Sequence, residues 1–192
     1  MAGKAKIQRA ARVVLKADEE VASAAIDHYQ PDLVDAIYSA TGGRGWPSGP
    51  ASNLLAAIAQ GAADREIARI GRELSTVPGT VLLEPGWEMN GNWSDYRWQG
   101  VANGGDAGAP ARYRQAWQRI VRIFREQGAA NVRWVFNPNV GNPLTWQPTG
   151  ASHWNWYANY YPGDAYVDYV GMHGFNAPTV FGAPWATFDA LF

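Results

Sequence analysis

The sequence has no cysteine among its 192 residues. It therefore offers no disulfide framework, no thiolate nucleophile and no zinc–thiolate site, and the absence says nothing about the cellular compartment. Long apolar runs are missing too, since no stretch approaches the roughly 20 apolar residues that span a bilayer. The start of the chain, MAGKAKIQRA, is polar and basic and leads into no apolar segment of the signal-peptide kind. We read neither a membrane anchor nor an export signal in this chain.

An excess of charge of either sign is also lacking. Lys and Arg number 16 and Asp and Glu 17, which gives a formal net charge of -1. Nucleic acids and anionic membranes are bound by basic surfaces, so neither is an expected partner. The three histidines, His28, His153 and His173, do not have the spacing of metal ligands. The sequence thus predicts an uncharged partner, no metal and no cofactor.

Aromatic residues are abundant instead. Ten Trp and nine Tyr are more than core packing requires, and flat rings suit the apolar faces and polar rims of sugars. The other interpretation is that many of these rings simply belong to the core, although large aromatic side chains are often left partly exposed. Composition alone leaves both interpretations open.

Helical and strand patterns alternate along the second part of the chain, which is typical of a parallel sheet. A chain of this length can bury a sizeable core and is expected to form one domain. The predicted helices begin at Asn53, at about Asp64 and at about Pro110, and they end near Gly61, before Pro78 and before Gln127. The predicted strands are residues 80–83, 131–136 and 166–170.

The pattern before residue 53 is weaker. Residues 17–40 carry a helical pattern that is interrupted at Pro31, which predicts two short helices or a helical hairpin. Residues 41–52 are rich in Gly and Pro and are expected to be loop. Only residues 11–15 resemble an early strand.

Glu88 is the most informative residue of the sequence. It lies in the run WEMNGNW, residues 87–93, shortly after the first predicted strand. A glycosidase needs a carboxylic acid whose pKa is raised by an apolar wall, so that it can protonate a leaving oxygen near neutral pH. Trp87, Met89 and Trp93 are suited to form that wall. The alternative is a carboxylate that is merely solvated or paired.

Polar residues follow all three predicted strands. Glu88 follows the first, Asn137 and Asn139 the second, and His173 the third. Such clustering suits the catalytic rim of a (β/α) barrel. Asn-Pro-Asn is also a strong turn sequence, and for these two asparagines we favour the turn over a bond to sugar hydroxyls. His173 is either a rim residue that contacts substrate or a partly buried residue bonded to backbone, and both readings stay open.

Three sequence runs stand out in this part of the chain. They are LEPGWEMNGNW at residues 83–93, VFNPN at 135–139 and YPGDAYVDYVG at 161–171, together with the helices that carry residues 61–64 and Trp117. In this order, over roughly residues 53–177, they resemble glycoside hydrolase family 26. That family contains the β-mannanases and related endo-acting enzymes of the retaining (β/α)8 clan.

The resemblance implies endo-hydrolysis of a β-linked plant-type polysaccharide, most often mannan. Glu88 matches the family's general acid/base at the end of the fourth strand. In the retaining mechanism it would protonate the departing oxygen and then deprotonate the water that hydrolyses a glycosyl-enzyme intermediate. The family places the nucleophilic Glu on the seventh strand, for which the sequence up to Phe192 has no match. We expect that Glu downstream of Phe192, and little or no activity from the chain as it stands.

A (β/α)8 barrel typically needs about 250 residues. We therefore expect an α/β fold of the TIM-barrel type that is partial, with strands up to about the sixth present and the seventh and eighth missing. Residues 1–52 would be an N-terminal helical segment that matches the barrel poorly. Residues 53–192 would be the barrel core, truncated at its C-terminus.

The sequence departs from the family pattern at three positions. Glu84 stands where many relatives have Arg, and Trp87 stands where the mannanases usually have His. Phe175 replaces a Tyr that often contacts the nucleophile, and a Phe side chain cannot donate a hydrogen bond. Glu84 is also too close to Glu88 in sequence to face it across a sugar. The departure at Trp87 argues mainly against mannan as the substrate.

Several residues near Glu88 are expected to bind the sugar. Asn90 supplies an amide that can bond a hydroxyl or orient the carboxylate. For Trp146, Trp154 and Trp156, a glycan subsite and a packed loop are both open. The expected substrate-binding residues are Trp87, Asn90, Trp93, Trp98, Asn137 and His173.

The leading hypothesis is an endo-acting retaining glycoside hydrolase. A non-catalytic glycan-binding remnant is the alternative, and a third possibility is a fragment made unstable by the exposed edges of a half-closed barrel. The sequence does not choose among mannan, xylan and mixed-linkage glucan. The resemblance implies secretion, whereas the N-terminus shows no export signal; the complete domain is expected to be a monomer.

Overall fold

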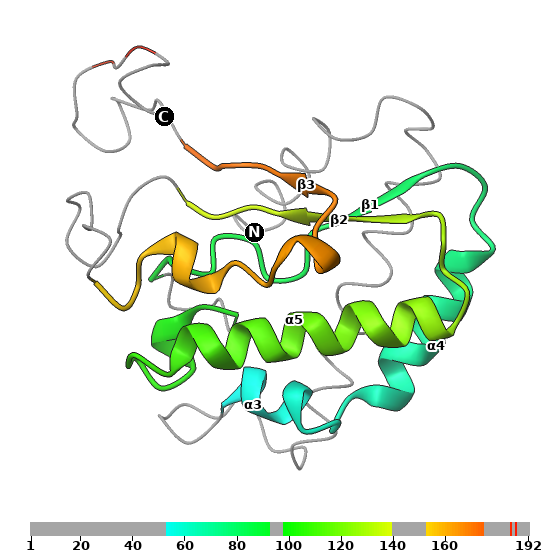
Figure 1. Ribbon diagram of the computed structural model, residues 1–192, viewed down its shortest axis with the longest axis horizontal. Coiled ribbons are helices and arrows are strands. Elements are labelled where there is room, and N and C mark those ends of the chain that lie inside the picture. Colours follow the sequence, from blue (N-terminus) through cyan, green and yellow to red (C-terminus); the bar gives the residue numbers. More distant parts are fainter. Residues whose placement is uncertain (1–52, 93–97, 140–152, 175–184, 186, 188–192) are drawn as a thin grey trace, which may run out of the picture.

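The computed structural model describes residues 53–92, 98–139, 153–174, 185 and 187. A three-stranded sheet lies on one side of three helices, with α5 between the sheet and α3 (Figure 1). The expectations for residues 1–52 and for Trp93, Trp146 and Phe175 lie outside the described residues.

The three helices are α3 (Leu54–Ala59), α4 (Asp64–Ser75) and α5 (Ala109–Glu126). All three confirm the helical periodicity of the sequence. Asn53 caps α3, because its side chain accepts a hydrogen bond of 3.0 Å from the backbone N–H of Ala56. Pro110 lies in the first turn of α5, where its missing N–H costs no helical hydrogen bond.

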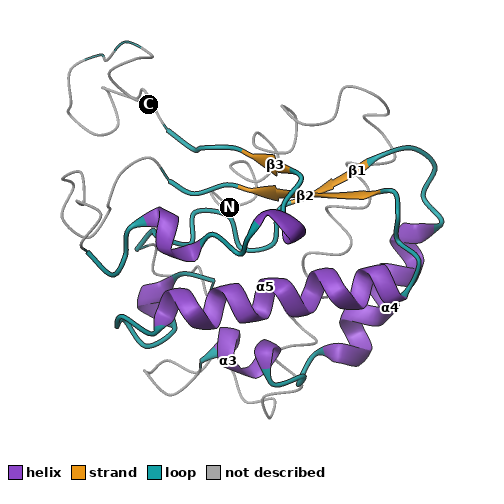
Figure 2. Ribbon diagram, viewed as in Figure 1, coloured by secondary structure: helices purple, strands orange, loops and turns teal. Residues whose placement is uncertain are grey.

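The sheet consists of β1 (Val81–Leu83), β2 (Val132–Phe136) and β3 (Tyr169–Val170), all parallel and in this order (Figure 2). The strands predicted at 80–83 and 131–136 are confirmed. The predicted strand 166–170 is wrong at its start. There Asp164–Tyr166 form a 3-10 turn, η3, in which the Tyr166 N–H bonds the carbonyl of Gly163 at 2.9 Å.

A side chain replaces backbone pairing just before β3. The carboxylate of Asp168 accepts a hydrogen bond of 2.8 Å from the backbone N–H of Trp134 in β2. The N–H of Asp168 in turn donates to the carbonyl of Trp134 at 2.9 Å. Asp168 therefore ties the approach to β3 to the middle of β2, and regular pairing begins only at Tyr169.

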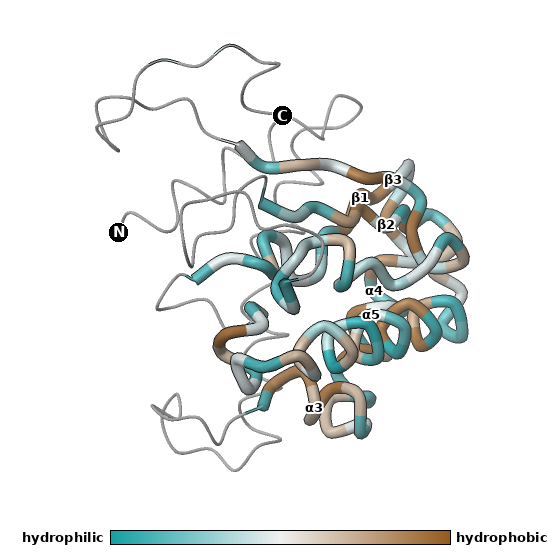
Figure 3. The backbone as a smooth tube through the Cα atoms, turned by 60° about the vertical axis from the view of Figure 1, so that its left-hand side comes forward, coloured by the Kyte–Doolittle hydropathy of each residue, from teal (hydrophilic) through white to brown (hydrophobic). Residues whose placement is uncertain are grey.

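The core lies between α5 and the sheet. The ring of Trp117 on α5 meets Trp134 and Phe136 of β2 edge to face, at centroid distances of 6.3 and 6.2 Å. Phe124, two turns further along α5, meets Trp134 at 5.1 Å. Hydrophobic residues accordingly gather along the strands and on α5 (Figure 3). The Trp117 indole N–H donates to the carbonyl of Tyr166 at 2.9 Å, so its polar atom is satisfied.

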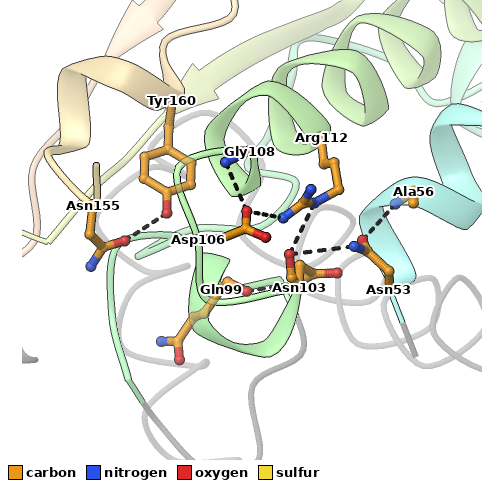
Figure 4. A network of polar contacts seen from close by, with 9 residues as sticks. All are labelled: Asn53, Ala56, Gln99, Asn103, Asp106, Gly108, Arg112, Asn155 and Tyr160. Carbon is orange, nitrogen blue, oxygen red and sulfur yellow. Dashed lines mark hydrogen bonds and ion pairs between the residues drawn. The ribbon is translucent and has the colours of Figure 1, made fainter. Parts of the chain in front are cut away.

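A polar network joins the starts of α3 and α5 (Figure 4). Asn103, which ends the 3-10 turn η1 (Gly100–Ala102), lies at its centre. Its side-chain oxygen accepts from the N–H of Leu55 at 2.9 Å, and its backbone carbonyl accepts from Arg112 Nε at 3.0 Å. Arg112 also pairs with Asp106 at 2.5 Å. The network fixes the loop that leads back to the carboxyl edge of the sheet.

The α/β class and the parallel sheet are thus confirmed, whereas a barrel, whole or partial, stays a prediction. The carboxyl ends of parallel strands meet at one edge, and the isolated parallel bridge between Asn139 and His173 continues that edge beyond β2 and β3. Within the described part of the chain, no helix is both long and apolar enough to cross a bilayer.

Candidate active site

The turn after β1 depends on a glycine. Gly86 has a φ of 67°, which a side chain rarely allows, and a Cβ built there would lie 2.6 Å from the ring of Trp98. The hydroxyl of Tyr113, on α5, donates to the carbonyl oxygens of Pro85 and Gly86, each at 3.2 Å. A sharp turn therefore follows β1 at Gly86, and α5 helps to hold it in place.

Glu88 takes up the next unusual backbone conformation. Its φ is 49°, the one positive value among the described residues other than glycine. Its N–H donates to the carbonyl of Asn137 at 2.8 Å, and its carbonyl accepts from the N–H of Gly91 at 2.8 Å. A conformation of this kind costs about 1–3 kcal/mol and persists where surrounding contacts fix it. Here one contact comes from Gly91 in the same turn and the other from Asn137, directly after β2.

The carboxylate of Glu88 is only 1% exposed. Its Oε1 accepts a hydrogen bond of 3.2 Å from the side-chain amide of Asn139 and lies 3.4 Å from His173 Nδ1. Asn139 follows β2 and His173 follows β3, and the backbone N–H of His173 donates to the carbonyl of Pro138 at 2.8 Å. The carboxyl ends of all three strands therefore deliver one side chain to the same point.

Asn90 is bonded within the protein. Its amide donates to the carbonyl of Asn139 at 2.9 Å and accepts the N–H of Asn139 at 2.9 Å, which makes a reciprocal pair. The side chain of Asn155 donates to the carbonyl of Asn90 at 2.8 Å, and the Tyr160 hydroxyl donates to Asn155 at 2.6 Å (Figure 4). Asn90 thus orients Asn139, which contacts Glu88. A bond from Asn90 to a sugar stays a prediction.

Asn155 and Tyr160 were missed by the sequence analysis. Both are fully buried, with Tyr160 at the end of the 3-10 turn η2 (Tyr157–Tyr160). Burial raises the pKa of the Tyr160 phenol, so it stays a hydrogen-bond donor over the ordinary pH range. No motif marked them, because their contact with Asn90 spans 65 residues of sequence.

A second carboxylate, Glu84, lies in the same group of side chains. The Asn137 amide nitrogen donates to Glu84 Oε2 at 3.2 Å and lies 2.7 Å from His173 Nε2. Burial raises the pKa of Glu84, while the hydrogen bond from Asn137 and the charge of His173 act in the opposite direction. From the sequence, Glu84 was noted only as a departure from the family pattern and as too close to Glu88 to face it across a sugar.

The remaining expected site residues lie in different surroundings. The Trp87 ring is tilted against His173 at a centroid distance of 5.6 Å. Trp98 is buried in the core with 7% exposure, and Met89 is fully buried there as well. His173 is partly buried, its backbone N–H bonds the carbonyl of Pro138, and its ring contacts the side chains of Asn137 and Glu88. Substrate contacts by Trp87, Trp98, Asn137 and His173 stay predictions.

Metal-ligating side chains do not cluster in the described residues: no three His, Asp or Glu side chains there are grouped so that they could hold an ion. Trp154 stacks on His153 at 5.7 Å and packs against the core, which is the packed-loop arrangement. The described side chains at the carboxyl edge of the sheet are two carboxylates, the amides of three asparagines and an imidazole.

Taken together, these features describe an α/β domain with a buried carboxylate at the carboxyl edge of a parallel sheet, where α/β enzymes carry their active sites. The model of glycosyl hydrolase family 26 matches residues 51–183, which is well over half of the chain. The chain belongs to this family, and the resemblance seen in the sequence is confirmed.

Similar proteins of known activity agree with the family. Endoglucanase H of Acetivibrio thermocellus is 37% identical over 140 residues, which are 70% of this chain and 14% of that protein. A mannan endo-1,4-beta-mannosidase of Bacillus subtilis is 29% identical over 99 residues, which are 50% of this chain and 23% of that protein. The chain therefore spans less than a quarter of the length of these curated relatives.

The solved structures that match this chain include two Bacillus subtilis mannanases. The match to the first has 27% sequence identity and a TM-score of 0.43, and it covers 58% of this chain and 30% of the mannanase chain. The other has 22% identity and a TM-score of 0.48, with coverage of 74% and 41%.

Proposed function

We propose that this chain forms part of the catalytic domain of an endo-acting retaining glycoside hydrolase, with Glu88 as general acid/base. One observation carries the proposal: a buried carboxylate is held at the carboxyl edge of the sheet, inside the region that the family model matches. A glycosidase acid needs this withdrawal from water, because it must keep its proton until the glycosidic oxygen departs.

The chemistry follows the retaining scheme. Glu88 protonates the leaving oxygen as a second carboxylate attacks the anomeric carbon, and it then deprotonates the water that releases the sugar. The Asn139 amide donates a hydrogen bond to Glu88 Oε1, and His173 Nδ1 lies 3.4 Å from the same oxygen. We assign the nucleophile to a Glu downstream of Phe192. Glu84 does not suit that role, because it lies directly after β1, too close to Glu88 in sequence to face it across a sugar. Its carboxylate is also hydrogen-bonded to Asn137.

The proposed substrate is a β-linked plant-type polysaccharide, with mannan first. The names of the relatives support both a mannan and a glucan backbone. Trp87, which stands where mannanases usually have His, makes the glucan a serious competitor. We further propose that the complete protein is a secreted monomer.

The test is reducing-sugar release from mannan, xylan and mixed-linkage glucan. The 192-residue chain should release little or none, whereas a polypeptide extended beyond Phe192 should be active. In the extended protein, Glu88→Gln should abolish hydrolysis, because no other described group is placed to protonate the leaving oxygen. The matched control is Glu126→Gln, an exposed carboxylate at the end of α5, which should keep the parent activity. Near-parental activity of Glu88→Gln would refute the assignment.

A glycan-binding remnant is the second candidate. The observation in its favour is that Glu84 and Glu88 both make hydrogen bonds to asparagines of the protein itself. Calorimetric titration with mannan and glucan oligosaccharides separates the two. Binding without hydrolysis, in the extended protein as well as in the short one, would favour the remnant over the enzyme.

A further inference from the structure

Four polar side chains form a continuous row at the carboxyl edge of the sheet, in the order Glu84, Asn137, His173, Glu88. Asn137 Nδ2 lies 3.2 Å from Glu84 Oε2 and 2.7 Å from His173 Nε2. The other ring nitrogen, His173 Nδ1, lies 3.4 Å from Glu88 Oε1. Every link of this polar row therefore joins two side chains that reach the edge from different strand ends.

The orientation of the Asn137 amide determines the tautomer of the imidazole. An ionised carboxylate only accepts hydrogen bonds, so the amide must turn its NH₂ group toward Glu84. The same nitrogen faces His173 Nε2 and has no lone pair to offer, so Nε2 must accept. A neutral imidazole that accepts at one nitrogen carries its proton on the other, which here is Nδ1.

We propose that the Glu84 carboxylate, acting through the Asn137 amide, fixes the proton of neutral His173 on Nδ1, where it faces Glu88. Glu84 and Asn137 are then positioning residues for the acid/base. The inference deepens the proposed function and rests on it for the catalytic consequence alone, because the position of the proton can be measured without substrate.

The opposite orientation of the amide is the competing arrangement. It would bring Asn137 Oδ1 against the Glu84 carboxylate, so that two acceptors face each other. In the observed orientation Oδ1 is buried and has no hydrogen-bond partner among the described residues, and it lies 3.0 Å from the place where a Cβ on Gly171 would be. An unsatisfied buried oxygen favours turning the amide over. The carboxylate of Glu84 opposes that turn, so its removal should release the amide.

The charged groups around His173 agree with this arrangement. Glu84 and Glu88 approach the ring from the turn after β1, one through Asn137 and the other directly. The Trp87 ring covers the imidazole from the same turn. Burial raises the pKa of Glu84, and the hydrogen bond from Asn137 limits that rise because it favours the ionised carboxylate.

Nitrogen-15 NMR of histidine-labelled protein tests the proposal in the full chain. Three histidines give few signals, and His28→Gln and His153→Gln identify those of His173. Above the pH at which the ring is charged, we expect Nδ1 at the position of a protonated nitrogen and Nε2 at that of a bare one. A proton on Nε2 in the parent protein would overturn the proposal.

Two variants test the parts played by Glu84 and Asn137. Glu84→Met removes the acceptor and should shift both ring signals toward the Nε2-protonated form, whereas Glu126→Met, the same change at an exposed site, should shift neither. Asn137→Asp places an acceptor opposite Nε2 and should draw the proton there. Ring signals that stay at the parent positions in either variant would overturn the proposal. If Glu84→Met does not fold, the parent and Asn137→Asp spectra still decide.

The measurement separates this proposal from the proposed function. An extended protein without hydrolytic activity but with the proton on Nδ1 would refute the enzyme and leave the polar row intact. An active enzyme with the proton on Nε2 would do the reverse.

Discussion

At the scale of single residues, the turn between β1 and Trp98 concentrates the unusual conformations. Gly86 and Glu88 both have positive φ, two residues apart, and both are held by contacts from other elements. Tyr113 on α5 bonds the turn from one side, and Asn137 after β2 bonds it from the other. The position of the Glu88 carboxylate thus depends on a helix and a strand that lie far from it in sequence.

Gly86→Ala should destabilise the protein more than an equivalent change elsewhere. Its Cβ would meet the Trp98 ring at 2.6 Å in addition to the strain of a φ of 67°. We expect a loss of about 2–6 kcal/mol, the sum of backbone strain and overpacking. Urea denaturation measures the loss, and Gly128→Ala is the control, because it has a φ of 79° but no described atom within 4 Å of its Cβ position. Equal losses in the two variants would contradict a steric role for Trp98.

Glu84→Gln should change how stability depends on pH. The folded-state pKa of Glu84 is raised, so the folded protein binds more protons than the unfolded chain, and the contribution of Glu84 to stability falls as pH rises from about 4. The amide of the glutamine variant cannot ionise, so the variant escapes that fall. Its free energy of unfolding, relative to the parent, should therefore increase between pH 4 and neutral pH. A difference that is independent of pH would show that burial does not govern this carboxylate.

How well single residues could be predicted depended on sequence distance. Glu88 stood out because its motif is local. The bond from Asn137 to Glu84 and the bond from Asn155 to Asn90 join residues 53 and 65 positions apart. Sequence spacing predicts no contact between residues so far apart. An Asn-Pro-Asn run predicts a turn whether or not its side-chain amides also bind a functional residue.

At the scale of elements, periodicity predicted the helices well and the last strand poorly. The apolar faces of α4 and α5 repeat at helical spacing over 12 and 18 residues, which leaves little ambiguity. The stretch before β3 is rich in Tyr and Val and has strand propensity. A local turn at Gly163, with a φ of 102°, and the side chain of Asp168 take up its hydrogen bonds instead.

Asn53→Ala should lower stability by about 1 kcal/mol through loss of the cap on α3. Asn53 also donates to the carbonyl of Asn103, at 3.4 Å, so the change weakens the link between α3 and η1 as well. Asn53→Ser keeps a side-chain oxygen at the cap and should recover most of the loss. Thermal unfolding of the three proteins makes the comparison. A serine variant no better than alanine would mean that the bond to Asn103, and not the cap, is what matters.

At the scale of the whole molecule, α5 is the element that connects the sheet, α4 and the turn after β1. It packs on the sheet through Trp117 and Phe124, and it supports the turn after β1 through Tyr113. Its Arg119 forms a pair of hydrogen bonds with Asp64, which ties it to the start of α4. Damage to the middle of α5 should therefore reach the sheet, the helices and the Glu88 turn together.

Trp117→Ala should be strongly destabilising. Trp117 is 1% exposed and its indole N–H bonds Tyr166, so its removal leaves a large cavity and an unsatisfied carbonyl. The expected loss is about 3–5 kcal/mol, a large part of the roughly 5–15 kcal/mol that stabilises a typical domain. Trp117→Phe, which keeps a ring but loses the N–H, should cost less. Chemical denaturation followed by circular dichroism measures both, and equal losses would contradict the role of the ring.

The backbone of Glu88 has a consequence for the evolution of this protein. A residue with a side chain is kept at φ 49° with its carboxylate buried, although a glycine there would relieve both costs. Selection for thermal stability alone should therefore enrich Glu88→Gly, and selection for turnover should restore the glutamate. The sequence at position 88 would then record which of the two pressures a lineage has experienced.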